Sequence, residues 1–321
     1  MICPKCGFSA EQNEIFCPRC GTQLQNRPPR RSALGAIGRA LCYYFLFVVV
    51  QSVVTGVYAG MLAASMMYED MMNAALNGNM LDFLTAFEAV YEVLYEKIHI
   101  LLILSALITV LIVFLSLRLR RKNPVTEVHL RPIPGKSVLP ALLFGAALQV
   151  FAVITISLIP IPEDVLNSFS ESSALLSSGP FWLELLSVVI VTPILEELIF
   201  RGLVFTRLRR GMSAFAAVLL SAIIFGWAHG NEISFVYAAV FGILLALVMR
   251  RQNDSILAPI LMHAGFNGTS YLLSLLGEEI NTFLFLALYL VSIALSVICG
   301  YLLLRKPAAD EHEIPDTTSQ S

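Results

Sequence analysis

The sequence predicts an all-α polytopic membrane protein with about eight transmembrane helices, preceded by a small zinc ribbon with four cysteine ligands. Three observations carry this prediction. Of the 321 residues, 57% are hydrophobic and only 14% are charged, whereas a soluble protein has about 25% charged residues. Several apolar runs approach the ~20 residues that a helix needs to cross a bilayer. Two C-x-x-C-G pairs stand near the N-terminus.

The predicted zinc ribbon occupies residues 1–25. Its two C-x-x-C-G pairs have the spacing of a structural tetrahedral zinc site, and the glycine after each pair allows a tight turn. Two disulfides are the alternative. However, no cleavable signal peptide precedes the first apolar run, which indicates a reducing compartment. The expected zinc ligands are Cys3, Cys6, Cys17 and Cys20.

Residues 26–38 are predicted to form a polar linker, and residues 39–137 two transmembrane helices joined by an acidic extracytoplasmic connector. The two helices are expected at about 39–64 and 98–117, with the connector at 65–97. Apolar residues in the connector recur at helical spacing, which predicts an amphipathic helix at the membrane surface.

Residues 138–306 are predicted to form a core of six further helices. A second acidic loop at 160–180 separates the first two of them, and residues 307–321 have the composition of a disordered tail. The six helices are expected at about 138–159, from 181 onward, and at 214–229, 233–249, 255–276 and 282–304.

An even number of spans puts both termini on one side of the membrane. Among the 21 Lys and Arg residues, Lys97 alone falls on the opposite side. Since cytoplasmic loops carry the excess of Lys and Arg, we expect a multi-pass plasma membrane protein with both termini in the cytoplasm. The zinc ribbon then lies in a compartment that keeps its thiols reduced.

Glu196 and Glu197 stand side by side in an apolar run that otherwise has the composition of a membrane span. An acid at the centre of such a helix costs roughly 2.5 to 3.5 kcal/mol or more, and two adjacent carboxylates cannot easily both be charged. Arg201 follows Glu197 by four residues on the same helix face, so we expect it to supply a compensating positive charge. Alternatively, the span ends earlier and both acids face water.

Two later apolar helices also carry polar residues. His229 ends the run F-G-W-A-H, and His263 and Asn267 lie one helical turn apart on one face of a further helix. Ionisable groups in membrane spans usually face the interior of the bundle and have a function there. Pro193 and Pro259 each free a backbone carbonyl near these residues and can kink their helices. We expect the three helices to converge on one site.

Three motifs follow one another on these helices. They are E-E-x-x-x-R from Glu196 to Arg201, F-x-x-x-H from Phe225 to His229, and H-x-x-x-N from His263 to Asn267. Each motif alone is weak, but three in this order on separate apolar helices are specific. The chain resembles the type II CAAX prenyl endopeptidase and bacteriocin-processing family, also called the CPBP or Abi intramembrane proteases. The resemblance covers about residues 138–304 and leaves out the zinc ribbon.

The resemblance implies a hydrolase that cuts a peptide bond of a membrane-associated protein or peptide inside the membrane. Glu196 would be the general base that activates water, with His229 holding that water. His263 and Asn267 would donate hydrogen bonds to the oxyanion, and the second glutamate and the arginine would form a supporting pair. Membrane lipid is the expected surrounding, no nucleic-acid partner is expected, and the oligomeric state is open.

A catalytic metal is the alternative mechanism, since Glu196, His229 and His263 could bind zinc with one open position. The sequence contains no H-E-x-x-H helix of the kind typical of metalloproteases, so we favour metal-free chemistry. Two other classes of function stay open. A non-catalytic membrane scaffold or bacteriocin-immunity protein could retain the same polar cluster, and a transporter could use the buried ions as a pathway.

Overall fold

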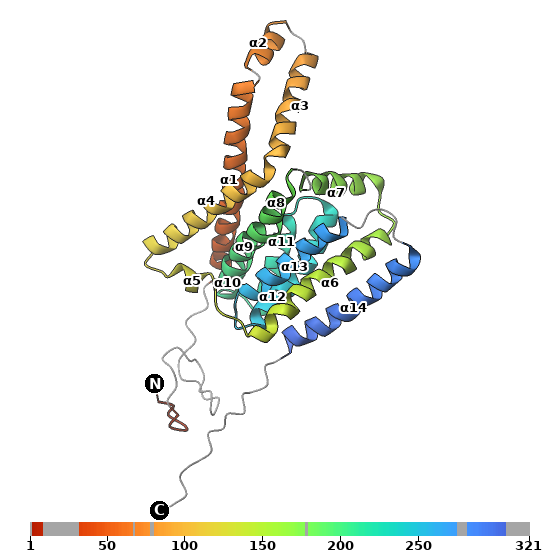
Figure 1. Cartoon of the computed structure of the whole chain (residues 1–321). Helices are drawn as coiled ribbons and strands as arrows, with labels where there is room; N and C mark the ends of the chain where they lie inside the picture. The colour runs from red at the N-terminus through yellow and green to blue at the C-terminus, as the bar shows by residue number, and fades with distance from the viewer. Residues whose placement is uncertain are drawn as a thin grey trace, which may run out of the picture.

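The structure is a computed structural model, and almost all the residues that it describes are helical (Figure 1). The described residues are 2–8, 32–66, 68–77, 80–176, 179–274 and 281–305. The second cysteine pair, residues 26–31 of the predicted linker and the predicted disordered tail therefore lie outside the described residues.

The first long helix, α1 (Ala33–Met66), begins within the segment predicted as a linker. Its 34 residues extend over about 51 Å at 1.5 Å per residue, which exceeds the ~30 Å hydrocarbon core of a bilayer. Its far end projects beyond the rest of the bundle, where α2 (Tyr68–Asn77) and α3 (Met80–Glu96) continue the chain (Figure 1). The acidic connector thus holds two helices instead of the one predicted.

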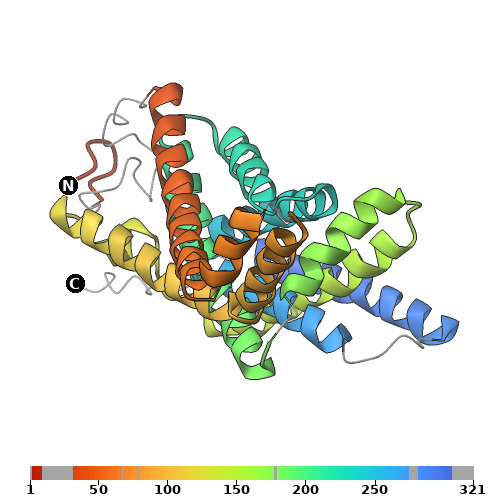
Figure 2. The same ribbon diagram turned by 90° about the horizontal axis from the view of Figure 1, so that it is seen from above.

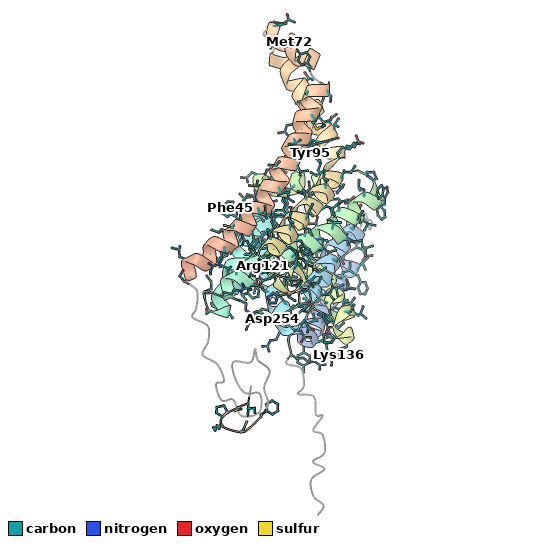
Figure 3. All side chains as sticks on the ribbon, turned by 90° about the vertical axis from the view of Figure 1, so that its left-hand side faces the viewer. Phe45, Met72, Tyr95, Arg121, Lys136 and Asp254 are labelled. Atoms are coloured by element: carbon teal, nitrogen blue, oxygen red, sulfur yellow. The ribbon has the colours of Figure 1, made fainter. Side chains whose placement is uncertain are left out.

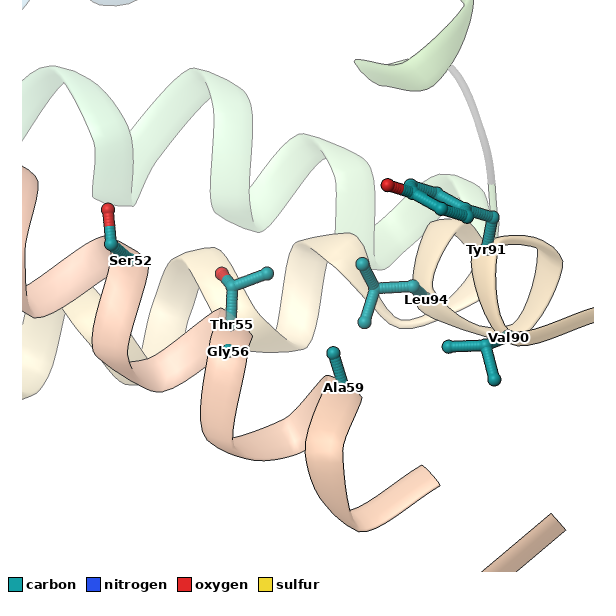
Figure 4. Close-up of a pocket in the computed structure, with 7 residues that line it drawn as sticks. All are labelled: Ser52, Thr55, Gly56, Ala59, Val90, Tyr91 and Leu94. Carbon is teal, nitrogen blue, oxygen red and sulfur yellow. The ribbon is translucent and has the colours of Figure 1, made fainter. Parts of the chain in front are cut away.

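α3 runs back along α1. Val90 of α3 is buried against Leu62 and Ala63 of α1, so part of the apolar stripe on α3 faces another helix. A cleft of ≈ 350 Å³ lies between the two helices beside this contact. Small and apolar side chains of α1 and α3 line most of it (Figure 4).

Helices on two sides enclose the centre of the bundle. α4 (Ile98–Leu119) packs beside α1 at one side, whereas α6 (Val138–Ser157) and α14 (Thr282–Leu304) pack together at the other (Figure 2). The observed bounds of α4, α6 and α14 agree with the predicted bounds to within two residues. The predicted and observed bounds agree because these helices are long apolar runs. Such a run must be helical in lipid, where its backbone groups can be satisfied only within the helix.

α13 (Leu257–Ser274) carries His263 and Asn267 and packs along α6. The two backbones approach so closely that a Cβ at Gly145 would lie 1.7 Å from the carbonyl oxygen of Met262. No side chain larger than hydrogen fits at this crossing, so α6 holds α13 in a fixed position.

α11 (Ala214–Trp227) and α12 (Glu232–Arg251) form a helical hairpin that packs against the central helix. The Ser213 side chain caps α11 by accepting from the backbone N–H of Ala216, and Asn231 caps α12 in the same way. Ser and Asn are favoured at this position because they satisfy an otherwise unpaired N–H.

The central helix carries the two glutamates and runs unbroken from Phe181 to Arg209. It consists of α8 (Phe181–Glu184), the π-helix η2 (Leu185–Val191), α9 (Thr192–Glu196), the π-helix η3 (Glu197–Phe205) and α10 (Thr206–Arg209). All nine residues of η3 are buried, because α1, α11 and α12 surround it. A helix enclosed in this way needs apolar residues all round, so its charged residues require partners.

The acidic segment predicted as a loop at 160–180 contains a further helix, α7 (Glu163–Leu176). Two acids stand in its first turn, where negative side chains stabilise the positive helix end. α7 packs against α12, and Phe169 meets Tyr237 of α12 edge-on with ring centroids 6.4 Å apart.

Five helices within the described ranges are long and apolar enough to cross a membrane. They are Ala33–Ser65, Ile98–Leu119, Gly135–Ser157, Glu232–Arg251 and Thr282–Leu304. The span Gly135–Ser157 consists of α6 and the short 3₁₀ helix η1 (Gly135–Ser137) that precedes it. The other three predicted spans, at the central helix, α11 and α13, stay a prediction. α11 is apolar but has only 14 residues.

Apolar side chains also cover the outside of the bundle. On α1, five residues at intervals of four are each more than half exposed: Phe45, Val49, Val53, Val57 and Met61. A soluble monomer rarely exposes such a continuous apolar stripe. The five apolar helices and this outward-facing stripe together indicate a membrane protein.

Loops rich in Lys and Arg lie at the end of the bundle opposite to the α2–α3 hairpin. Figure 3 shows Lys136 and Asp254 at this end, Met72 at the other, and Arg121 between them. The start of α1 and the end of α14 are also at the basic end (Figure 1).

Glu127, in the short helix α5 (Pro124–Glu127), connects the loop after α4 to the end of the central helix. It accepts hydrogen bonds from Lys122 at 2.9 Å and from Arg207 at 2.6 Å, and Arg210 lies 3.5 Å away. Burial alone would raise the pKa of Glu127, but the hydrogen bond from Lys122 and the charges of Arg207, Arg210 and Lys122 lower it to about 2.

Candidate active site

An ion pair inside the central helix forms the middle of the candidate site. Arg201 Nη1 donates to Glu197 Oε1 at 2.9 Å, with the two side chains 2% and 0% exposed. The Arg201 guanidinium lies over the Phe225 ring at 4.0 Å, a favourable cation–π geometry. Its Nη2 points to the Gly242 carbonyl at 3.5 Å. A Cβ at Gly242 would lie 3.3 Å from that nitrogen, so glycine leaves the space that Arg201 uses.

His263 reaches both glutamates from α13. Its Nδ1 lies 3.0 Å from Glu197 Oε1, and its Nε2 lies 3.8 Å from Glu196 Oε2. The imidazole is 5% exposed and meets the rings of Phe225 and Phe241 in T-shaped contacts, with centroids 5.9 and 5.5 Å apart. These rings and the Glu197 contact together fix the plane of the imidazole.

Glu196 is the more accessible of the two acids. Its side chain is 14% exposed, whereas that of Glu197 is fully buried. Glu196 Oε2 is itself buried and accepts no hydrogen bond from the described residues. A buried carboxylate oxygen without a donor is costly, and such atoms often have a catalytic or binding role. Glu197 Oε2 is likewise buried without a donor among the described residues, so the greater exposure of the Glu196 side chain is what distinguishes the two acids.

His229 lies just beyond the end of α11 and forms no hydrogen bond or ion pair with either glutamate in the described part of the chain. Its Nδ1 lies 2.8 Å from the carbonyl oxygen of Phe225, and its ring packs edge-on against the Phe225 ring at 4.6 Å. Since a carbonyl only accepts, Nδ1 carries the proton and Nε2 is an acceptor in the neutral ring. Phe225 also contacts His263, so its ring joins the two histidines.

Asn267 lies one turn beyond His263 and is half-buried. Its Nδ2 donates to the carbonyl oxygen of Val188 at 2.8 Å, which leaves one N–H of the amide for another acceptor. The structure thus brings the two glutamates, the arginine and His263 into direct contact. His229 contacts the Phe225 ring, which in turn contacts His263. Asn267 lies one turn along α13 from His263.

The contacts of Glu197 determine the proton position on His263. An ionised carboxylate only accepts hydrogen bonds, and the same Oε1 of Glu197 faces both Arg201 and His263. Nδ1 of His263 therefore carries a proton. Nε2 then has a lone pair in the neutral ring and an N–H in the imidazolium. In the imidazolium form, two cations and two carboxylates balance the charge of the cluster.

The described residues contain no group of three or more His, Cys, Asp and Glu side chains that could hold a metal ion. In particular, the set of Glu196, His229 and His263 considered from the sequence does not converge in such an arrangement.

The structure describes two of the four predicted zinc ligands. Cys3 and Cys6 lie on a tight turn, in which the Gly7 N–H donates to the Cys3 carbonyl at 3.0 Å and Gly7 has a φ of 70°. This turn suits a metal-binding pair because glycine adopts the left-handed backbone at little cost. Cys17 and Cys20 lie outside the described residues, so zinc binding stays a prediction.

Sequence reasoning missed a third polar contact between the central helix and α13. The Tyr271 hydroxyl donates to Glu184 Oε2, and Glu184 is 7% exposed. A signal was available for both residues. Glu184 is an acid near the start of an apolar run, and Tyr271 follows Asn267 by four residues, as Asn267 follows His263.

Comparison with known proteins shows that residues 178–269 match the family model of the type II CAAX prenyl endopeptidase Rce1-like proteins. The matched segment contains all the motif residues from Glu196 to Asn267. No curated protein and no solved structure matches the chain. The segment that holds the candidate active site is therefore similar to the Rce1-like type II CAAX prenyl endopeptidases.

Proposed function

We propose that the chain is an intramembrane endopeptidase that hydrolyses a peptide bond of a membrane-associated protein or peptide. The contact of His263 with two adjacent carboxylates, at 3.0 and 3.8 Å inside apolar helices, carries this proposal. Ionisable groups buried in membrane spans are functional by default. The family match over residues 178–269 supports a protease.

Glu196 is the proposed general base. Its Oε2 takes a proton from water while the water oxygen forms a bond to the carbonyl carbon of the substrate. A positioned base of this kind contributes a factor of about 10² to 10⁴ to the rate. His229 orients the same water, because its Nε2 can accept a hydrogen bond while Nδ1 is held by Phe225.

His263 and Asn267 are the proposed donors to the oxyanion. They use the Nε2–H of the imidazolium and the second N–H of the amide, and one such donor contributes ~2.7 to 4 kcal/mol. When Glu196 accepts the proton, the negative charge moves from its carboxylate to the oxyanion. The net charge of the buried cluster stays constant, which limits the cost of the reaction at low dielectric.

We further propose a plasma membrane location with both termini in the cytoplasm and with membrane lipid around the helices. The positions of Lys136 and of the outer ends of α1 and α14, on the side of the bundle away from the α2–α3 hairpin, support this orientation. Cytoplasmic loops are the ones that carry excess Lys and Arg.

The test uses the purified chain in lipid vesicles with membrane-associated peptides, and maps products by mass spectrometry. Glu196→Gln keeps size and hydrogen bonding, so we expect turnover to fall by about 100-fold or more with the melting temperature unchanged. His263→Ala and Asn267→Ala should lower kcat more than they change KM. The exposed Glu171→Gln on α7 is the control and should cleave as the wild type does.

Two outcomes contradict the proposal. Wild-type rates from Glu196→Gln would remove Glu196 as the base. A biological effect that survives Glu196→Gln, with no cleavage by the wild type, would favour a non-catalytic scaffold or immunity protein.

A further inference from the structure

We propose that Pro193 is a positioning residue that orients Asn267, and this inference rests on the proposed role of Asn267 in the protease. Pro193 has no backbone N–H and thereby leaves the carbonyl of Val188 without a partner in its own helix. Asn267 supplies that partner from α13, and the bond directs the rest of its amide.

The backbone register of the central helix identifies the carbonyl. At the end of η2, the N–H of Thr192 donates to the carbonyl of Ser187, five residues earlier. The next bond in this π register would join residue 193 to Val188. Residue 193 is proline, so this bond cannot form, and an unpaired carbonyl in an apolar interior is costly.

Asn267 fills this position with good geometry. Its Nδ2 lies 2.8 Å from the Val188 oxygen, within the normal range for an N–H···O bond. The neighbouring Gly268 faces the same turn of the central helix, since a Cβ there would lie in van der Waals contact with a methyl group of Val189, at 3.4 Å. One N–H of the amide is thus used for structure, and the direction of the second N–H is fixed with it.

α13 makes polar contacts with the central helix at three successive turns. His263 contacts Glu197, Asn267 contacts the Val188 carbonyl, and Tyr271 donates to Glu184. The two outer contacts prevent α13 from rotating about its own axis. The Val188 contact therefore sets the direction of the Asn267 amide without setting the position of the whole helix.

A double-mutant cycle tests the coupling through stability. Pro193→Ala restores an N–H in the central helix. Val188 then receives a backbone donor in either register, from residue 193 if the turn stays π-helical or from Thr192 if it becomes α-helical. Asn267→Leu keeps the size of the side chain but removes its donors. We expect Asn267→Leu to lower the melting temperature in the wild type and to lower it less in the Pro193→Ala background.

Pro259→Ala is the matched control. Pro259 stands in the first turn of α13, where backbone N–H groups have no intrahelical partner. It should show no coupling with Asn267→Leu. Equal losses for Asn267→Leu in the wild type and in Pro193→Ala would overturn the inference. If Pro193→Ala does not fold, Pro193→Ser, which also carries an N–H, replaces it in the cycle.

Turnover gives the second measurement. Pro193→Ala should lower kcat by about 10- to 100-fold, since a misplacement of about 1 Å can cost a factor of 100, while KM stays within about twofold. Wild-type kcat in a variant that shows the stability coupling would mean that the bond is structural only. Stability coupling without cleavage by the wild type would instead contradict the proposed protease.

Discussion

One oxygen of Glu197 joins two helices: Oε1 accepts the hydrogen bond of Arg201 at 2.9 Å and lies 3.0 Å from Nδ1 of His263. The arginine is on the central helix and the histidine is on α13. The fully buried carboxylate therefore fixes both the protonated nitrogen of His263 and the direction of its Nε2 toward Glu196. Glu197 thus orients the ring, whereas Glu196, the more exposed of the two acids, is the proposed base.

Glu197→Gln should destabilise the protein more than Glu196→Gln does. It leaves the buried Arg201 without its carboxylate, and breaking a buried pair in this way costs about 3 to 5 kcal/mol. Thermal unfolding in detergent checks this. Replacing both partners, with Arg201→Met added, should recover part of the loss, because no unpaired charge remains. A melting temperature for Glu197→Gln equal to that of the wild type would contradict the assignment.

Cleavage should persist after metal removal. The measurement uses the Cys3→Ser/Cys6→Ser variant, so that zinc in the N-terminal ribbon cannot obscure the result. Chelator treatment followed by metal analysis should yield a metal-free protein that cleaves at the rate before treatment. If chelation stops cleavage and added zinc restores it, the metal-free mechanism is wrong and Glu196 with the histidines must be reconsidered as ligands.

Acid should remove the stabilisation that Glu127 contributes. Its pKa is lowered from 4.5 to about 2 in the folded chain, so its ionised form favours folding. The contribution is complete above about pH 4.5 and is lost as the pH falls toward 2. The melting temperature of Glu127→Gln should lie below that of the wild type at pH 7, and the difference should shrink below pH 4.5. A constant difference at every pH would contradict the ion-pair network.

Single cysteines should report the orientation in the membrane. Cysteines at Asn77 and Ser172, placed in a background without reactive native cysteines, should react with an impermeant thiol reagent in intact cells. A cysteine at Lys136, at the opposite end of the bundle (Figure 3), should react only after lysis. The reverse pattern would invert the proposed topology.

The purified full-length chain should contain one zinc ion per molecule. Replacing Cys17 with Ser should remove it, since a structural tetrahedral site needs all four ligands. Cys42→Ser is the matched control and should retain the zinc, because Cys42 lies within α1. Zinc content that is unchanged in Cys17→Ser would rule out the predicted ligand set.

Much of the helical architecture was predictable because lipid cannot satisfy an open backbone, so long apolar runs must be helical. The helix predicted at 282–304 is observed as Thr282–Leu304. The acidic segments were harder to interpret, since α2, α3 and α7 gain stability from neighbours that a local pattern does not include. The π-helical turns were not predicted, because hydropathy does not distinguish π from α register.

The sequence by itself determined which polar residues enter the apolar helices and that Glu197 and Arg201 share a helix face, since both follow from composition and the 3.6-residue repeat. Only the tertiary structure decided which glutamate is fully buried and which stays partly exposed. Glu196 and Glu197 are adjacent and chemically identical, and they differ because Arg201 donates to Glu197 and because His263 lies 3.0 Å from Glu197 but 3.8 Å from Glu196. The packing of α13 against the central helix also places Asn267 beside the Val188 carbonyl, which Pro193 leaves unpaired. Asn267 and Val188 are 79 positions apart in the sequence.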